Sequence, residues 1–386
     1  MGGHKPTVVY IYMASIRPIV NTPNYQRPLT LSKHTRLHIL TKGEVTQEIE
    51  HLSHVHRMRY STGVMVLDFF LFVLWSFFKT ILISRSEHVD VVETHTDYTH
   101  FVGYFLSKLG FGWIADIWDH PDLYTETSKV FGKVQTSFLR ARLKNSDRIL
   151  CHTHPSVLAG YGIPERLISS FPNGVLTDLE SRMPEIPETG ELRLVYVGYV
   201  VPQRGIDVLL KAFSLVYNDL HDCKLLLVGP MLSEKLRITN MIEDLNVKQG
   251  VHLTGELQHQ DVLRLLKSSS VGLYPFPRTK YLDNVYPVKV PEYLSFGLPV
   301  IASNLAGVRT YIVDGENGFL YEPEDYIALS KLIRRLVADE NLRREMSLKA
   351  LNSCRKFDWN LINSKAMEVT MNTIRTLRSD RITAKS

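Results

Sequence analysis

The sequence lacks most of the features that mark a disulfide-bonded or zinc-binding protein. Its three cysteines, Cys151, Cys223 and Cys354, are far apart and include no Cys-x-x-Cys pair. An odd number of scattered cysteines argues against a disulfide framework and favours a reducing compartment. His152 and His154 lie near Cys151 without a second group of ligands, so a structural zinc site is not expected.

Runs of one charge and low-complexity segments are also missing. The net charge of +5 is mild for 386 residues, and no segment rich in lysine and arginine suggests an arm that binds nucleic acid. Contact with phosphates or anionic lipid head groups stays open. The first residues contain no long apolar stretch before a cleavage site, so we interpret Thr7–Met13 as a strand and not as part of a signal peptide.

One long apolar run, Val64 to Ser84, is present and would be long enough to cross a bilayer. Asp68 and Lys79 interrupt it eleven residues apart, so both fall on one face of a helix. Three interpretations are open: a buried helix with a polar stripe, a helix in the membrane interface, and a true span. The span is the least favoured, because it would place two charges in hydrocarbon.

Short apolar runs alternate with helical stretches in two successive series, a pattern typical of parallel βαβ units. The predicted strands of the first series are Thr7–Met13, Leu37–Thr41, Asp90–Glu93, Trp113–Ile117 and Arg148–Cys151. Those of the second are Leu194–Val197, Lys224–Val228, Val251–Leu253, Val271–Tyr274 and Pro299–Ala302. We expect two doubly wound, Rossmann-like α/β domains facing a cleft, because such sheets bind ligands beyond the carboxyl ends of their strands.

Composition suggests where these domains begin and end. The predicted N-terminal domain covers residues 1–176, and a linker rich in proline and acidic residues covers 177–192. The predicted C-terminal domain covers 193–358. Residues 359–386 are expected to form a helix that can pack back on the N-terminal domain.

Two stretches of the second half suggest an anion site. After the strand that ends at Val197, Gly198 permits a tight turn, and Arg204 precedes an amphipathic helix. A cation beside a helix N-terminus suits an anion, although a polar loop with a surface arginine would look the same. Ala306-Gly307-Val308 offers backbone amides after a later strand, with Gly307 as the candidate for ligand approach.

The segment PVKVPEYLSFGLPVIAS places Lys289 three residues before Glu292 at the start of a short predicted helix. The pair fits a nucleotide-sugar, with Lys289 for the diphosphate and Glu292 for the ribose hydroxyls. The alternative is a surface ion pair worth only about 0.3 kcal/mol.

In order and spacing, these stretches resemble family 4 glycosyltransferases of the GT-B fold. The resemblance covers essentially the whole second half and the segment DRILCHTHPSVLAGYGIPERLISSFPNGV of the first. It implies that Arg204 and Lys289 hold the donor diphosphate and that Glu292 is the second glutamate of a Glu-x7-Glu motif. Two positions depart from the family pattern: Asn284 stands where the first glutamate is expected, and Tyr199 where a small or basic residue is expected.

In the first half, the resemblance indicates contacts to the donor sugar and the acceptor. Asp119 and His120 are the candidate catalytic residues, in the segment IADIWDHPDLYTE. His95, at the end of a predicted strand, is a second candidate for the cleft. Arg27 is a candidate phosphate or acceptor contact, in place of the glycine-rich acceptor loop of the family, which is not evident here.

The resemblance implies a retaining glycosyltransferase that uses a nucleotide-sugar donor and a glycan or lipid-linked acceptor. No Asp-x-Asp motif occurs in the chain, so neither a metal nor another cofactor is expected. We expect a cytoplasmic protein, at the cytoplasmic face of a membrane if residues 64–84 contact lipid. The departures at Tyr199 and Asn284 leave a catalytically impaired binding protein open, and the missing acceptor loop leaves a nucleotide-sugar epimerase open.

Overall fold

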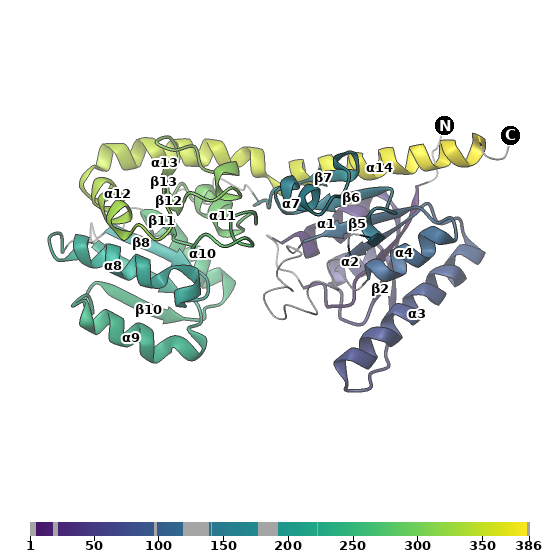
Figure 1. Ribbon diagram of the computed structural model, residues 1–386, viewed down its shortest axis with the longest axis horizontal. Coiled ribbons are helices and arrows are strands. Elements are labelled where there is room, and N and C mark those ends of the chain that lie inside the picture. The colour runs from purple at the N-terminus through teal and green to yellow at the C-terminus, as the bar shows by residue number, and fades with distance from the viewer. Residues whose placement is uncertain are drawn as a thin grey trace. The chain divides into compact units, whose positions relative to one another are not determined.

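The computed structural model describes residues 5–17, 22–95, 99–118, 139, 141–176, 192–221 and 223–383 (Figure 1). The chain divides into two compact units. Unit 1 comprises Met1–Asn173 together with Trp359–Ser386, and unit 2 comprises Gly174–Asp358. Most of the predicted linker lies outside the described residues, and the first strand of unit 2 begins at Leu192.

Unit 1 is built on a parallel sheet whose described strands run in the order β3-β2-β1-β4-β5-β6-β7. The central strands are fully buried and mostly apolar, as in TVVYI and WIADI, because helices cover both sides of such a sheet. The strands are β1 (Thr7–Ile11), β2 (Arg36–Thr41), β3 (His54–Arg57), β4 (Val91–His95), β5 (Trp113–Ile117), β6 (Arg148–Cys151) and β7 (Ile168–Ser170).

The described helices of unit 1 connect these strands or return to them from the end of the chain. They are α1 (Pro23–His34), α2 (Gln47–His51), α3 (Met65–Ser86), α4 (His100–Lys108), α7 (Pro155–Gly160) and α14 (Trp359–Thr383). Phe72 of α3 and Leu106 of α4 pack with Val9 and Val92 of the sheet in one core cluster. Helices α3 and α4 therefore cover the same face of the sheet.

Helix α14 belongs to unit 1, although it follows unit 2 in the sequence. The Arg378 guanidinium donates from Nε to the Asp90 carboxylate at 2.6 Å. The Thr370 hydroxyl accepts a hydrogen bond of 2.7 Å from the buried Arg27 guanidinium. The end of the chain is thus tied to the first helix and to the residue that precedes β4.

Unit 2 repeats the same architecture, with described strands in the order β10-β9-β8-β11-β12-β13, all parallel. These strands are β8 (Leu192–Val197), β9 (Cys223–Val228), β10 (Val251–Gly255), β11 (Val271–Tyr274), β12 (Val300–Ser303) and β13 (Gly318–Tyr321). The helices are α8 (Ile206–Tyr217), α9 (Lys235–Asp244), α10 (His259–Lys267), α11 (Lys289–Ser295), α12 (Tyr326–Ala338) and α13 (Glu340–Cys354).

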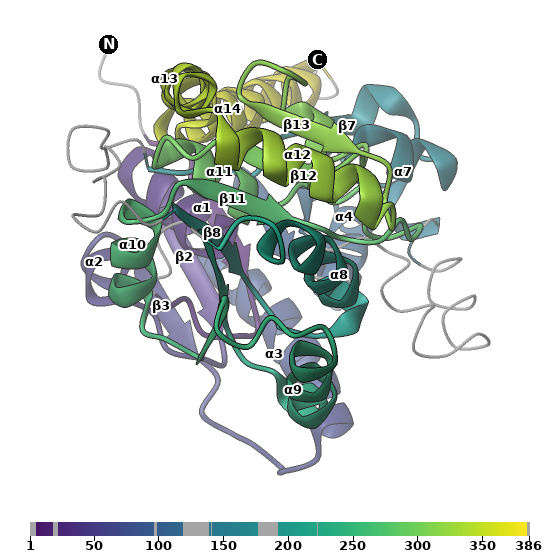
Figure 2. The ribbon, with the colours of Figure 1, turned by 90° about the vertical axis from the view of Figure 1, so that its left-hand side faces the viewer.

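Helices cover both faces of the unit 2 sheet. In Figure 2, α12, α8 and α9 form a row in front of the sheet, and in Figure 1, α10 and α11 lie on its other side. Helix α8 buries nine of its twelve residues, which explains its strongly apolar sequence IDVLLKAFSLVY. The two doubly wound, Rossmann-like domains predicted from the sequence are confirmed.

All ten predicted strands overlap with strands of the structure, but three further strands among the described residues, β3, β7 and β13, escaped the sequence pattern. Strand β3 is the edge strand HVHR, whose polar residues are partly exposed. Strand β13, GFLY, begins at the last glycine of the turn-forming DGENG segment, which obscures its short apolar run. Strand β1 ends at Ile11, two residues before the predicted end at Met13.

Candidate active site

The order of the strands in unit 2 identifies where a ligand would bind. The chain leaves β8 toward β9 on one side and later reaches β11 on the other side of β8, so the topological switch point lies between β8 and β11. In doubly wound sheets, ligands bind at the carboxyl ends of the strands at this point. The loops that follow β8 and β11 therefore form the candidate site.

These two loops touch through their backbones at Gly205. Gly205 has φ of +76°, and a Cβ atom there would lie 1.8 Å from the carbonyl oxygen of Pro275, which follows β11. Only glycine fits, because any side chain would both strain the backbone and collide with Pro275. Arg204, the preceding residue, lies 4.9 Å from the centre of the Phe276 ring. The predicted diphosphate contact is thus placed at the switch point and held over an aromatic ring.

The sequence-predicted Lys289 and Glu292 form an ion pair at the first turn of α11. The Lys289 ammonium lies 2.6 Å from Oε2 of Glu292. The two side chains differ in burial: 31% of Lys289 is exposed, but only 1% of Glu292. A partly exposed lysine bonded to a buried carboxylate is not the surface ion pair that the sequence left open. The buried Glu292 carboxylate holds the Lys289 ammonium in place.

A buried tyrosine connects this helix to the switch point. The backbone N–H of Val197, the last residue of β8, donates to the Tyr293 hydroxyl at 2.8 Å. Gly272 of β11 makes room for the Tyr293 ring, since a Cβ atom there would lie 2.7 Å from it. The start of α11 is therefore fixed beside the end of β8, next to Gly198, whose N–H donates to the Val228 carbonyl at 2.9 Å.

The loop after β12 is bound to the segment that precedes α11. The Ala306 N–H donates to the Asp283 carboxylate at 3.1 Å, and the Gly307 N–H donates to the Asp283 carbonyl at 2.8 Å. A Cβ atom at Gly307 would lie 2.0 Å from the Val285 carbonyl oxygen. The amides that the sequence offered to a ligand are therefore engaged within the protein, and Gly307 is needed for this close approach.

The two residues that depart from the family pattern are both accessible. The side chain of Tyr199 is half exposed, and its carbonyl accepts a hydrogen bond of 2.9 Å from the buried Tyr196 hydroxyl. The Asn284 side chain donates to the Lys280 carbonyl at 3.3 Å. Neither side chain fills the interior of the site.

Unit 1 has the same topology, with its switch point between β1 and β4, but the residues there pair with one another. Arg27, on the helix that follows β1, binds both carboxylate oxygens of Glu93 on β4, at 2.6 and 2.7 Å. His95 lies 3.3 Å from Glu93 and 3.1 Å from Asp116 of β5. All four side chains are at least 96% buried. Arg27 and His95, predicted as contacts open to a ligand, are enclosed within unit 1.

The charges of this buried cluster balance each other, and the pKa values follow. Burial opposes ionisation of Asp116, but His95, His152 and Arg27 together lower the pKa of Asp116 to about 2. Burial likewise opposes charge on His95, yet the neighbouring Asp116 and Glu93 raise the pKa of His95 above its ordinary value. The cluster therefore pairs Arg27 and His95 with the carboxylates of Glu93 and Asp116. Glu93, His95 and Asp116 are close enough to share a metal ion, but both carboxylates already have partners within unit 1.

The catalytic candidates Asp119 and His120 lie outside the described residues. Trp118, the residue before them, donates from its indole to Asp116 at 2.8 Å and contacts the His95 ring at 4.9 Å between centres. His152, at the end of β6, lies 3.8 Å from the other Asp116 oxygen. The segment that carries the two candidates thus begins at the edge of the buried cluster.

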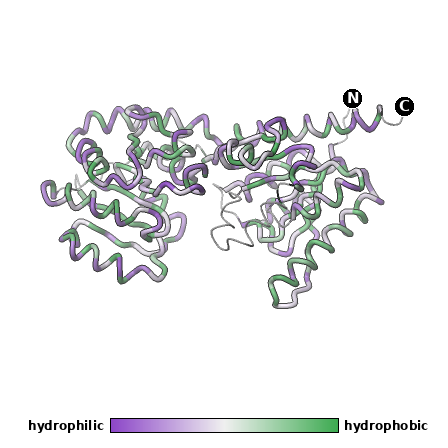
Figure 3. Tube along the Cα trace, in the orientation of Figure 1, coloured by the Kyte–Doolittle hydropathy of each residue, from purple (hydrophilic) through white to green (hydrophobic). Residues whose placement is uncertain are grey.

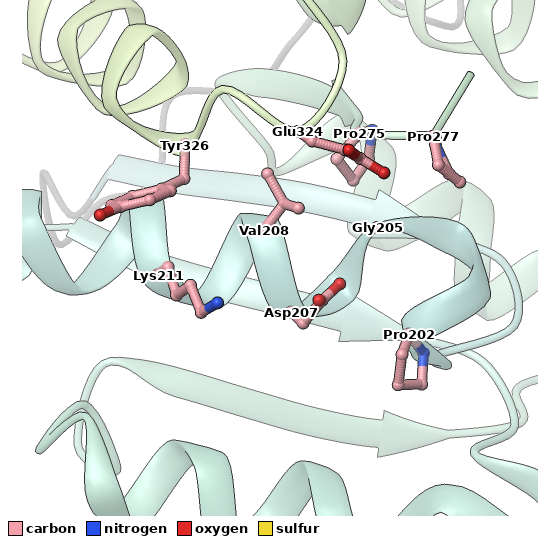
Figure 4. A pocket seen from close by; sticks show the side chains of 9 residues that line it. All are labelled: Pro202, Gly205, Asp207, Val208, Lys211, Pro275, Pro277, Glu324 and Tyr326. Carbon is pink, nitrogen blue, oxygen red and sulfur yellow. The ribbon is translucent and has the colours of Figure 1, made fainter.

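A pocket of about 450 Å³ in unit 2 is lined by residues of α8, of the loop after β11 and of the segment that leads into α12 (Figure 4). It includes Gly205 but none of the charged residues predicted to hold the donor. Asp207 and Lys211 point toward it from α8, and Glu324 and Tyr326 from the start of α12 (Figure 4). The pocket is therefore adjacent to the switch point and distinct from the Lys289–Glu292 site.

Several residues of both sites could not be chosen from the sequence. Phe276 beneath Arg204, and Tyr293 between α11 and β8, look like ordinary core residues in the sequence. Arg278 donates to the Asn304 carbonyl at 2.6 Å and thus ties the β11 loop to the β12 loop. Glu93 carried a usable signal, because an acidic residue that follows the apolar Val91-Val92 within a buried strand must find a buried cation.

With this geometry in place, comparison with known proteins is informative. Residues 179–352 match the family model of the glycosyl transferases group 1. Unit 2 carries a glycosyl transferases group 1 domain. The match includes Arg204, Lys289 and Glu292, so the candidate site lies within this domain.

Relatives and solved structures extend the similarity beyond the group 1 domain. A phosphatidyl-myo-inositol mannosyltransferase of Mycobacterium leprae is 27% identical over 52% of this chain and 52% of its own length. The chain therefore matches about half the length of that relative. An uncharacterized glycosyltransferase of Methanocaldococcus jannaschii is 24% identical over 92% of this chain and 93% of its own. HepE of Anabaena, solved with UDP and glucose, shares the fold with a TM-score of 0.72 over 96% of this chain and 100% of its own, at 14% identity.

Proposed function

We propose that the chain is a retaining glycosyltransferase that moves a sugar from a nucleotide-sugar donor to a glycan or lipid-linked acceptor. One observation carries the proposal: a partly exposed lysine, held by a buried glutamate, stands in the group 1 domain on the helix tied to its switch point. The names of the relatives support the same class of reaction. The UDP and glucose bound to HepE, which shares the fold, support a nucleotide ligand.

In this proposal, Arg204 and Lys289 stabilise the negative charge that develops on the departing nucleotide diphosphate. Fixed cations at such a position act without reorganisation during the reaction. Glu292 holds the Lys289 ammonium in place, and since only 1% of its side chain is exposed, this positioning is its main proposed role. The absence of an Asp-x-Asp motif supports a reaction without a metal ion. We assign no protein nucleophile, and we keep Asp119 and His120 as candidates for contacts to the sugar.

The proposed location is the cytoplasm. The three cysteines are buried and form no disulfide, which agrees with a reducing compartment. Donor hydrolysis and transfer would then take place where nucleotide-sugars are made.

The test is an assay of donor hydrolysis and sugar transfer in Lys289→Ala and Glu292→Ala. Loss of one charge-assisted contact to the diphosphate, worth about 1.5–3 kcal/mol, should lower turnover or donor affinity roughly tenfold to hundredfold. Lys349→Ala is the matched control, because Lys349 forms an exposed ion pair with Glu345 at the same 2.6 Å in the same unit. It should leave activity unchanged.

Full activity in both site variants would refute the proposal. Tight nucleotide binding by the wild-type protein without any transfer would favour the binding protein instead. Release of an altered sugar in the absence of an acceptor would favour the epimerase.

A further inference from the structure

Helix α3 is apolar on its exposed side as well as on the side that packs against the core. Three of its five buried residues, Asp68, Ser76 and Thr80, are polar. Its exposed side carries large apolar residues, each 52–59% exposed, at helical spacing: Val66, Leu67, Phe70, Leu74, Phe78 and Leu82. We define these six residues as the α3 stripe. In Figure 3, α3 is coloured as hydrophobic along most of its length.

The other long helix of unit 1 provides a comparison. Helix α14 has 25 residues against 22 in α3, and it buries its apolar residues, such as Trp359, Ile362 and Ile374. In α14, only Leu361 and Ile382 are large apolar residues with exposed side chains. The α3 stripe, on a helix about 33 Å long at 1.5 Å per residue, is therefore not a general property of long helices in this unit.

The buried side of α3 fixes the helix to unit 1. The Asp68 carboxylate accepts hydrogen bonds from the side chains of Lys42, Ser61 and Thr62. Phe72 and Ile83 pack in the core cluster with β1, β2 and β4. The helix has the length and hydropathy of a membrane span. Only 28% of its most apolar window is buried in the protein. It is neither a buried core helix nor a helix that can leave the sheet without exposing Asp68 and Phe72.

The charges around the stripe favour one kind of partner. Asp68 is the only acidic residue in α3, and it is buried and paired. Arg59 before the helix and Arg85 in its last turn are exposed. Next to the helix start, Tyr60 and Met65 are 63% and 81% exposed. An apolar face with cations at both ends and no exposed acid matches the boundary between acyl chains and anionic head groups.

We propose that unit 1 docks on an anionic lipid bilayer through the α3 stripe, with α3 lying in the membrane interface. This inference does not depend on the proposed function, because it concerns a surface of unit 1, whereas the candidate donor site belongs to unit 2. If both hold, the protein transfers sugar beside the membrane, where a lipid-linked acceptor would be available.

The experiment is flotation of the full chain with vesicles of phosphatidylcholine, with or without phosphatidylglycerol. The wild-type protein should float with the anionic vesicles. Phe70→Asp combined with Phe78→Asp should lower binding by at least about tenfold, because two rings that would enter the bilayer become charged side chains. Leu232→Asp combined with Leu236→Asp is the matched control, since both leucines are 67–73% exposed in unit 2. This control should bind as the wild type does.

A charge-reversal variant tests the electrostatic part. Arg59→Glu and Arg85→Glu should each weaken binding to anionic vesicles by about fivefold and have little effect on neutral ones. If the double phenylalanine variant does not fold, as judged by circular dichroism, Leu74→Gln replaces it and should weaken binding in the same direction.

Three results would overturn the proposal. In the first, the wild-type protein does not float, or the α3 variant floats equally well. In the second, the bound protein resists extraction by alkaline carbonate, which would indicate a span. In the third, light scattering shows a dimer without vesicles that the α3 variant converts to a monomer, while flotation is absent; the stripe would then be a contact between copies of this chain.

Discussion

The two units share the strand order around their switch points but differ in how the charged residues there are exposed. In unit 1, Arg27, Glu93, His95 and Asp116 close on one another and are buried. In unit 2, Lys289 remains 31% exposed and is bonded to a buried glutamate. The fold therefore supplies the same place in both units, and the pairing of the charges decides whether a cation there is left open to a ligand.

The difference also bears on stability and binding. A closed set of buried charges costs a large free energy when one member is removed, because the others stay buried without partners. Removal of Lys289 also leaves the buried Glu292 carboxylate without its cation, so it should lower stability as well as donor binding. The comparison can be tested by substitutions that break one site and spare the other.

The largest effect is expected for Glu93→Gln in unit 1. It leaves the buried Arg27 and His95 cations short of an anion and should lower the free energy of unfolding by about 3–5 kcal/mol. Tryptophan fluorescence during denaturation reports this unit alone, because all four tryptophans belong to it. Glu50→Gln is the control, since its pair with Arg57 is exposed and should be worth less than about 1 kcal/mol. Equal losses in the two variants would contradict the account.

A smaller effect is expected for Gly205→Ala in unit 2. The added Cβ atom would meet the Pro275 carbonyl, so the β8 and β11 loops must separate. We expect a loss of about 3 kcal/mol and weaker nucleotide binding, measured by thermal unfolding with and without UDP. Gly315→Ala is the matched control, with φ of +77° against +76° but no atom within 4 Å of the added Cβ. It should cost only about 1 kcal/mol. Equal losses of stability in Gly205→Ala and Gly315→Ala would show that the close approach of Gly205 to the Pro275 carbonyl is unimportant.

Acid should destabilise unit 1 by a still smaller amount. Burial lowers the pKa of His56 to about 4 and of His100 to about 3, below the unfolded value of about 6.5. The unfolded chain therefore binds protons first, and stability is lost as the pH falls from about 6.5 toward 3. His95, with its raised pKa, acts in the opposite direction but is outnumbered, since burial also lowers the pKa of His38 and His152. Fluorescence-monitored unfolding should show a loss on the order of 2 kcal/mol between pH 7 and pH 4. A free energy of unfolding that stays constant or rises between about pH 7 and pH 4 would contradict the role given to these buried histidines.

Much of this architecture could be predicted from the sequence, because buried parallel strands leave continuous apolar runs. The positions of Arg204, Lys289 and Glu292 followed from their place between strands and helices. Their burial did not, since spacing alone cannot distinguish an exposed pair from a lysine above a buried carboxylate. That difference is what separates the site from a surface ion pair.

The residues of unit 1 were harder to interpret. His95 and Arg27 are predicted as contacts for a ligand. Arg27 instead pairs with Glu93, which lies 66 residues later in the sequence, and only the strand order brings this pair together. The orientation of α3 was equally hidden, because the sequence gives the period of a helix but not which side meets the sheet. Long-range contacts decide both questions.

The most direct measurement is hydrogen–deuterium exchange of the full chain with and without UDP, GDP or ADP. The account predicts slower exchange, with at least one nucleotide, in residues 197–206 and 275–295 of unit 2. Residues 91–95 and 113–117, at the closed switch point of unit 1, should exchange equally with and without nucleotide. Protection of the unit 1 segments alone, or of neither unit with any nucleotide, would contradict the assignment of the donor to Arg204 and Lys289.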